Sequence, residues 1–301
     1  MAKWTFSVPE GYFDDCVPLA AQLPESRLTT RPLFALTLRA YPSDAAANSD
    51  KPPWARFVNH VQALNLEAPD NVSYKIMFLT RHAQGFHNAM KDKAAAGETC
   101  DENHGDDAEA QCFDALLTDV GIAQADALGA QWHATAGLPV PQSHYASPLT
   151  RCLQTAERYL QPLMSVRRGG GGISHRPTII KEGLRERWTT HTANMRRPRA
   201  WIAARWPACE IEHGFSEEDL LTMTMRAEQR AETETENRER VMRVLEDVFD
   251  EGDGAGEVVA WTFHSLTMRA LMGGLGMVPF KVQPATTVAV LVRGEKKKRE
   301  E

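Results

Sequence analysis

The sequence predicts an α/β protein, a three-layer α/β/α sandwich with a mostly parallel central sheet and helices on both faces. Two observations support this fold class. From residue 74 onward, short apolar runs rich in β-branched and aromatic residues alternate with longer stretches of helical periodicity, as in parallel sheets. The 301 residues are 43% hydrophobic and 25% charged, which is the composition of a soluble globular chain.

Residues 1 to 73 are predicted to be an N-terminal extension of short elements, because they hold eight of the 17 prolines. The same segment contains eight aromatic residues, too many for a solvated tail. We therefore expect the extension to pack on the core. The α/β domain itself is expected over residues 74 to 294, and the lysine-rich residues 295 to 301 are expected to be a charged, frayed tail.

The α/β domain is predicted to contain strands at residues 74 to 80, 143 to 146, 178 to 181, 257 to 263 and 286 to 292. Helices are expected between them, at residues 119 to 136, 149 to 164, 198 to 206, 217 to 250 and 266 to 276. The polar residues 91 to 112 and 167 to 172 are interpreted as surface insertions. The helix at 217 to 250 has a polar middle, so it is either a solvent-facing helix with internal ion pairs or part of a lid or a self-association face in a homo-oligomer.

Charge and cysteine content exclude several classes of partner. The net charge of −6, from 34 basic and 40 acidic residues, argues against nucleic-acid binding. No apolar run is long enough to span a membrane, and five scattered cysteines fit reduced thiols, so we expect a cytoplasmic protein. Cys100, His104 and Cys112 do not have a usual zinc-ligand spacing, so no metal or other cofactor is predicted.

Five chemically informative side chains follow predicted strands. Arg81 and His82 end the first strand of the domain, and His264 ends the fourth. Ligands of open α/β sheets bind outside the carboxyl ends of the strands, where a histidine beside an arginine can attack phosphorus. Arg151 lies in the first turn of a helix, a position that favours anions. Glu186, with Glu182 as the alternative, offers a carboxyl group for proton transfer.

The sequence resembles the histidine phosphatase superfamily, whose members are phosphoglycerate-mutase-like proteins. Within this superfamily it resembles the fungal phosphomutase-like branch. Five motifs in the order of the family support this resemblance: LTRHAQGFHN at 79 to 88, LTDVGIAQA at 117 to 125, SPLTRCLQTA at 147 to 156, GLRERWTTHTANMRR at 183 to 197 and FHSLTMRAL at 263 to 271. They span residues 74 to 292. The resemblance implies a phosphoglycerate-mutase-like fold and a histidine acid phosphatase-like hydrolase.

Transferred residue by residue, the resemblance implies that His82 is the phosphate-accepting nucleophile. It implies that Arg81, Arg151 and a protonated His264 surround the phosphate oxygens and that Glu186 is the proton donor. Asn88 matches a position that contacts the same anion, whereas His87 is either a pocket residue or an ordinary residue of the helix beginning near Gly85. Further substrate contacts are expected from Arg187 and His191.

The expected activity is metal-independent hydrolysis of a small-molecule phosphomonoester through a phosphohistidine intermediate. Leu266 replaces a frequent glycine, a departure that bears on substrate choice. Residues 187 to 192 lack the Tyr-Gly pattern of true phosphoglycerate mutases, which favours a phosphatase over a mutase. Two alternatives stay open. The scaffold could be redirected to another reaction on an anionic biosynthetic intermediate, including a diphosphate or non-phosphate substrate, or it could be a pseudoenzyme that only binds phosphorylated ligands.

Overall fold

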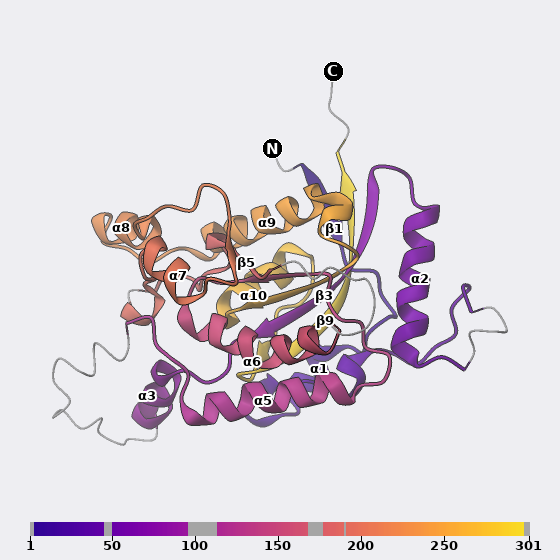
Figure 1. The fold of residues 1–301 in the computed structure, drawn as a ribbon, viewed down its shortest axis with the longest axis horizontal. Helices are drawn as coiled ribbons and strands as arrows, with labels where there is room; N and C mark the ends of the chain where they lie inside the picture. The colour runs from indigo at the N-terminus through magenta and orange to yellow at the C-terminus, as the bar shows by residue number, and fades with distance from the viewer. Residues whose placement is uncertain (1–2, 45–49, 96–112, 168–176, 190, 298–301) are drawn as a thin grey trace.

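The centre of the fold is a seven-stranded sheet with the strand order β1-β9-β3-β7-β4-β5-β6. The computed structural model describes residues 3–44, 50–95, 113–167, 177–189 and 191–297 (Figure 1). Strands β3, β7, β4, β5 and β6 run parallel, whereas β9 pairs antiparallel with β3 and β1 antiparallel with β9. The strands are β1 Trp4–Ser7, β3 Val72–Arg81, β4 Ser143–Ala146, β5 Ile179–Ile180, β6 Glu210–Ile211, β7 Val258–Phe263 and β9 Thr287–Lys296.

Side chains that alternate along β3 divide the interior into two cores. Met77 and Leu79 belong to the core beneath α9 (Glu234–Asp250) and α10 (Ser265–Gly274). Ile76 and Phe78 belong to the core beneath α2 (Pro53–Glu67), α5 (Asp119–Ala134) and α6 (Thr150–Arg167). Figure 1 shows α9 and α10 on one side of the sheet and α5 and α6 on the other. The predicted three-layer α/β/α fold with a mostly parallel sheet is therefore confirmed.

Shorter elements complete the fold. They are α1 Cys16–Ala21, α3 Phe86–Ala95, α7 Arg199–Arg205, α8 Leu220–Ala227, the 3-10 turns Pro24–Ser26, Pro32–Ala35, Glu182–Leu184, Thr192–Asn194 and Gly252–Gly254, and the strands β2 Arg27–Leu28 and β8 Lys281–Val282. Strands β2 and β8 form a separate parallel pair, which ties the N-terminal segment to the chain just before β9.

The prediction of a single helix over residues 217 to 250 is wrong, because the structure has two helices there, α8 and α9. Thr233 accepts a hydrogen bond from the backbone of Glu236, and the Glu236 side chain reaches back to the backbone of Thr233. This reciprocal capping box begins a new helix within the polar stretch. Arg230 forms an ion pair with Glu236 and so holds the connection against the new helix. Self-association of this region stays a prediction.

The N-terminal extension is more regular than the prolines indicate. The 15-residue helix α2 contradicts the expectation of short elements, because Pro52 and Pro53 begin this helix instead of interrupting it. Strand β1 joins the central sheet, and Trp54 and Phe57 are completely buried. At the other end, β9 continues through Glu295 and Lys296, two residues into the predicted tail.

Several predicted features lie outside the described residues. Of the insertion predicted over 91 to 112, the first five residues belong to helix α3, and residues 96 to 112, with Cys100, His104 and Cys112, lie outside the described ranges. So do residues 168 to 172 of the glycine-rich stretch and the last four residues of the tail. Within the described ranges, none of the helices combines the length and apolarity that a membrane crossing needs.

Candidate active site

His82 and His264 emerge side by side at the carboxyl edge of the sheet. The neighbouring parallel strands β3 and β7 end in register, with Arg81 opposite Phe263, so the residue after each strand reaches the same place. The two imidazole rings are 5.0 Å apart between centroids. Both side chains are almost completely buried, His82 at 2% exposure and His264 at 0%. The strand register therefore explains why two histidines 182 positions apart in sequence share one site.

Arg151 lies between these two rings. It follows β4 and stands in the first turn of α6, and its side chain is completely buried. Its Nε lies 3.3 Å from Nε2 of His82, and its Nη2 lies 3.3 Å from Nδ1 of His264. The guanidinium also donates to the Ala193 carbonyl, at 2.6 Å, and to Oδ1 of Asn194, at 3.1 Å.

No carboxylate of the described residues forms an ion pair with Arg151. Removing an unpaired charge from water costs several kcal/mol. Burial accordingly lowers the pKa of Arg151 below its ordinary value. An anion entering between Arg151 and the two histidines would remove much of this cost, so the arrangement favours anion binding.

The hydrogen bonds of His82 define which ring nitrogen is free to react. Its Nδ1 lies 2.6 Å from the carbonyl oxygen of Ala83. A carbonyl only accepts, so Nδ1 carries the proton, and Nε2 faces Arg151 with its lone pair. Burial, with Arg151 and Arg81 adding to it, lowers the pKa of His82 well below the ordinary value. The ring is therefore neutral, and the lone pair of Nε2 is on the side of the pocket.

His264 is also held in one tautomer. Arg151 only donates, so Nδ1 of His264 accepts, and Nε2 donates to Oγ of Ser147 at 2.8 Å. Burial and the Arg151 charge lower the pKa of His264 well below its ordinary value. In this environment the His264 ring is therefore neutral, and not protonated as expected from the resemblance.

The histidine pocket is the cavity of about 360 Å³ in front of His82. Arg81 is 7% exposed, lines this pocket and donates to the carbonyl of Val282 at 2.7 Å. Asn88 and His87 line it from α3, and the His87 ring lies 5.6 Å from that of His82. The structure thus places His87 in the pocket, which favours the first of its two interpretations.

Glu186 reaches the rim of the histidine pocket from the segment after β5. Its carboxylate accepts backbone hydrogen bonds from Leu266, at 3.2 Å, and from Thr267, at 3.1 Å, in the first turn of α10. These hydrogen bonds fix the position of the Glu186 carboxyl group beside the N-terminus of α10. The alternative Glu182 lies elsewhere, since it pairs with Arg185 and Arg196 at 2.8 Å each and does not line the pocket.

Two predicted substrate contacts are not in the histidine pocket. Arg187 lines a neighbouring cavity and forms an ion pair with Glu234 at 3.1 Å. His191 is exposed at the start of the turn Thr192–Asn194. Neither residue lines the histidine pocket, and their contact with the substrate stays a prediction.

Several lining residues were not predicted from the sequence. They are Glu25, Arg27, Gln84, Gln124, Thr189, Asn194, Ser265, Gln283 and Pro284. Gln84, Asn194 and Ser265 lie inside the quoted motifs, so those motifs could have indicated them. Glu25 and Arg27 come from the extension, where no local pattern indicates a site. Among the residues described, no three His, Cys, Asp or Glu side chains gather where a metal ion could bind.

Comparison with known families identifies the scaffold. A family model described as "Histidine phosphatase superfamily (branch 1)" matches residues 77–292. The chain belongs to this superfamily. The match covers the strand ends that carry His82 and His264, and it confirms the family resemblance of the five motifs.

Curated relatives of this histidine phosphatase superfamily member carry mutase names. The "Probable phosphoglycerate mutase" of Arthroderma benhamiae is 31% identical, over 97% of this chain and 85% of its own length. A "Probable phosphoglycerate mutase" of Saccharomyces cerevisiae is 25% identical, over 84% of this chain and 92% of its own length. Among solved structures, the ecdysone phosphate phosphatase of Bombix mori in complex with tungstate aligns with a TM-score of 0.48 and 18% identity, over 71% of this chain and 88% of that chain.

Proposed function

We propose that this protein is a metal-independent phosphatase that hydrolyses a small-molecule phosphomonoester through a phosphohistidine on His82. The observation that carries the proposal is the fixed tautomer of His82. Its Nδ1 proton is held by the Ala83 carbonyl, and its Nε2 lone pair faces Arg151 and the pocket. A binding module would need the arginines but not a neutral, oriented imidazole.

In the first step, Nε2 of His82 attacks phosphorus and the bond from phosphorus to the ester oxygen breaks. The protonated carboxyl group of Glu186 gives its proton to the departing oxygen, and the alcohol leaves. Arg81 and Arg151 neutralise the equatorial oxygens, and preorganised donors of this kind contribute about 3 kcal/mol each to the transition state. The phosphorylated ring keeps its Nδ1 hydrogen bond to Ala83.

In the second step, the ionised Glu186 removes a proton from water, and the resulting hydroxide attacks phosphorus. The bond between phosphorus and Nε2 breaks, inorganic phosphate leaves and His82 returns to its starting state. Glu186 is protonated again and ready for the next turnover. Two buried arginines supply the positive charge in this scheme, so no step calls for a metal ion.

The mutase names of the relatives give a second candidate, transfer of the phosphoryl group back to the substrate instead of to water. A phosphoglycerate substrate separates the two candidates. A phosphatase releases inorganic phosphate, whereas a mutase produces the isomeric phosphoglycerate and no phosphate. The absence of the Tyr-Gly pattern after Glu186 favours the phosphatase.

The test is hydrolysis of an aryl phosphate in the presence of a chelator, with the label on phosphorus and a rapid alkaline quench. The wild type is expected to turn over and to carry an acid-labile label, and His82→Ala is expected to do neither. Glu186→Gln is expected to lose about two to four orders of magnitude in kcat for alkyl phosphate esters. An alkoxide is a poorer leaving group than a phenolate, so its departure depends more on the proton from Glu186. His133→Ala is the matched control, since His133 is an exposed histidine on α5. Turnover that survives in His82→Ala would overturn the proposal.

A further inference from the structure

The N-terminal extension reaches the histidine pocket although the family match begins only at residue 77. Glu25 and Arg27 line this pocket and form an ion pair with each other at 2.9 Å. Glu25 and Ser26 have positive φ angles of 56° and 51°, a backbone conformation that residues other than glycine rarely adopt. Such strain persists only where surrounding contacts fix it, and it is common at functional sites. The extension is therefore held in a defined conformation at the mouth of the pocket.

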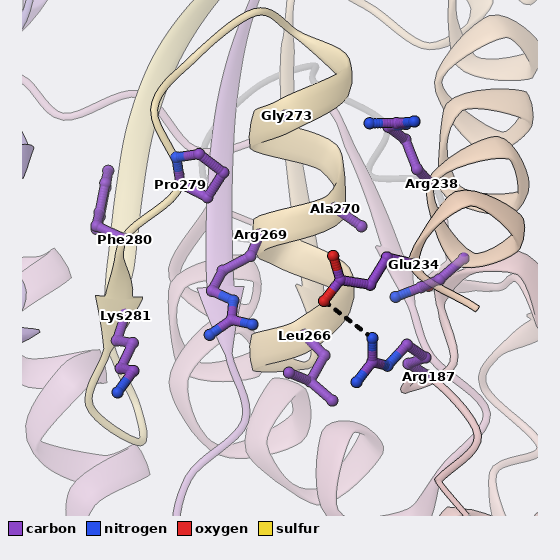
Figure 2. A pocket seen from close by; sticks show the side chains of 11 residues that line it. Arg187, Glu234, Arg238, Leu266, Arg269, Ala270, Gly273, Pro279, Phe280 and Lys281 are labelled. Carbon is purple, nitrogen blue, oxygen red and sulfur yellow. Dashed lines mark hydrogen bonds and ion pairs between the residues drawn. The ribbon is translucent and has the colours of Figure 1, made fainter. Parts of the chain in front are cut away.

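Strand β2 of the extension pairs with β8 beside α10. The parallel register places Arg27 opposite Lys281 and Leu28 opposite Val282. Figure 2 shows Lys281 and the chain leading into β8 along one side of α10, the helix that begins just after His264. The extension is thereby attached to the chain between α10 and β9.

The extension holds the loop that connects β8 to β9, residues 282 to 287, through three hydrogen bonds. The Leu28 carbonyl accepts from the amide of Gln283 at 2.8 Å and from the hydroxyl group of Thr286 at 3.3 Å. The Thr30 hydroxyl group accepts from the amide of Thr287 at 2.9 Å. Leu28 is itself buried in the core beneath α9 and α10. We call residues 282 to 287 the β8–β9 loop.

The β8–β9 loop in turn holds Arg81 by its side chain and by its backbone. Nη1 of Arg81 donates to the Val282 carbonyl at 2.7 Å, and the Arg81 amide donates to the Thr286 carbonyl at 2.9 Å. Ala285 lies between these two acceptors with a positive φ of 53°, and its amide donates to the His82 carbonyl at 3.1 Å. A loop with a strained residue needs outside contacts to keep one conformation. The three hydrogen bonds from the extension supply such contacts.

We propose that the N-terminal extension positions Arg81 for phosphate binding and that Thr30 is a positioning residue of the site. The proposal rests on the proposed function, which assigns Arg81 to the phosphate oxygens. Thr30 does not line the histidine pocket, so it acts through the β8–β9 loop. Loss of its hydroxyl group leaves the Thr287 amide without this acceptor. The β8–β9 loop then moves, and the Val282 carbonyl that orients the Arg81 guanidinium moves with it.

The first test is the activity of Thr30→Val toward an aryl phosphate, because valine has the shape of threonine without the hydroxyl group. Its kcat/KM is expected to fall about tenfold, since a small displacement of a preorganised donor weakens binding of the transition state. Thr30→Ser keeps the hydroxyl group and should retain the activity of the wild type. Thr29→Val is the matched control, because Thr29 is the exposed neighbour of Thr30, and it should also retain that activity.

A double-mutant cycle with Arg81→Ala separates positioning of Arg81 from a general effect on the fold. If Thr30 acts through Arg81, the tenfold loss in Thr30→Val shrinks to about twofold or less once residue 81 is alanine. A loss of equal size in both backgrounds would overturn the inference. Equal activities of Thr30→Val and Thr29→Val would overturn it as well.

Calorimetric binding of methylphosphonate, which is not hydrolysed, repeats the cycle without the reaction. Thr30→Val is expected to bind it about tenfold more weakly than the wild type, and this difference should again disappear in the Arg81→Ala background. If the binding cycle shows this coupling while His82 is never phosphorylated, the positioning of Arg81 stands and the phosphatase is refuted. If His82 is phosphorylated and neither cycle shows coupling, the phosphatase stands and positioning by the extension is refuted.

Discussion

At the scale of single residues, burial determines the protonation state of the site. His82 and His264 are both neutral because they are removed from water and face the Arg151 charge. A neutral imidazole is the form that attacks phosphorus, whereas a protonated one has no lone pair at Nε2. His82 is therefore already in the protonation state that the proposed reaction needs.

This state predicts the pH dependence of the reaction. Because the pKa of His82 is lowered, the nucleophile stays neutral when the pH falls through the ordinary histidine range, near 6.5. The acidic limb of kcat/KM, which reports the free enzyme, is expected below that range. The measurement is a pH profile with an aryl phosphate whose own second ionisation is determined separately. If the acidic limb of kcat/KM, corrected for ionisation of the substrate, lies at or above the ordinary histidine pKa, the neutral state of His82 is contradicted.

The sequence predicts the central residues of the site and not its periphery. Arg81, His82, Arg151 and His264 each end or follow an element whose periodicity is clear, so their convergence follows from the parallel sheet. Arg187 and His191 lie in a segment without regular structure. There the direction of a side chain depends on contacts with distant residues such as Glu234.

At the scale of elements, the N-terminus of α5 supports the loop after His82. Gly121 packs against Gln84, and an added Cβ would lie 2.0 Å from the Gln84 carbonyl oxygen. Thr118, the N-cap of α5, also accepts from Gly121 and donates to the Gln84 side chain. This contact explains how the motif at 117 to 125 supports the proposed nucleophile, His82, although it supplies no reacting group itself.

Gly121→Ala is expected to destabilise the protein by about 2 kcal/mol, because backbone must move to admit the methyl group. The same movement should displace Gln84 and lower kcat/KM for aryl phosphates. Gly273→Ala is the matched helical control, since the nearest heavy atom would be 3.9 Å away. Denaturant unfolding and steady-state kinetics test both variants. A Gly121→Ala protein as stable and active as the control would show that the contact is not needed.

The elements that the sequence did not predict have identifiable physical reasons. Helix α2 was missed because its two initial prolines resemble a turn signal, although proline is favoured in the first turn of a helix. Strand β1 is only four residues long and is defined by pairing with β9, at the far end of the chain. Short strands that depend on distant partners leave little local pattern.

At the scale of the whole molecule, the N-terminal extension and the family domain share their cores. Phe57 of α2 is completely buried and packs its ring against Tyr12, Phe13 and Trp54, at centroid distances of 5.5, 5.5 and 5.7 Å. The same cluster includes Phe78 of the central strand β3. We therefore expect the extension and the domain to unfold together.

Phe57→Ala should lower the free energy of unfolding of the whole protein by about 4 kcal/mol, because a large buried ring leaves a cavity. Leu66→Ala is the control on the same helix, since Leu66 is 87% exposed. Circular dichroism and loss of activity, followed through one denaturant titration, should give coincident transitions. Two separate transitions would show that the extension is an independent unit.

The pairing of β1 with β9 has a practical consequence for handling the protein. Trp4 lies opposite Lys296, and the amide of Lys297 donates to the carbonyl of Lys3 at 2.9 Å, so the two chain ends lie side by side (Figure 1). The same end of the sheet holds the start of β3, whereas His82 follows its other end, about 30 Å away along ten residues. A tag, a surface tether or a short covalent link between residues 3 and 297 would therefore leave the mouth of the histidine pocket open.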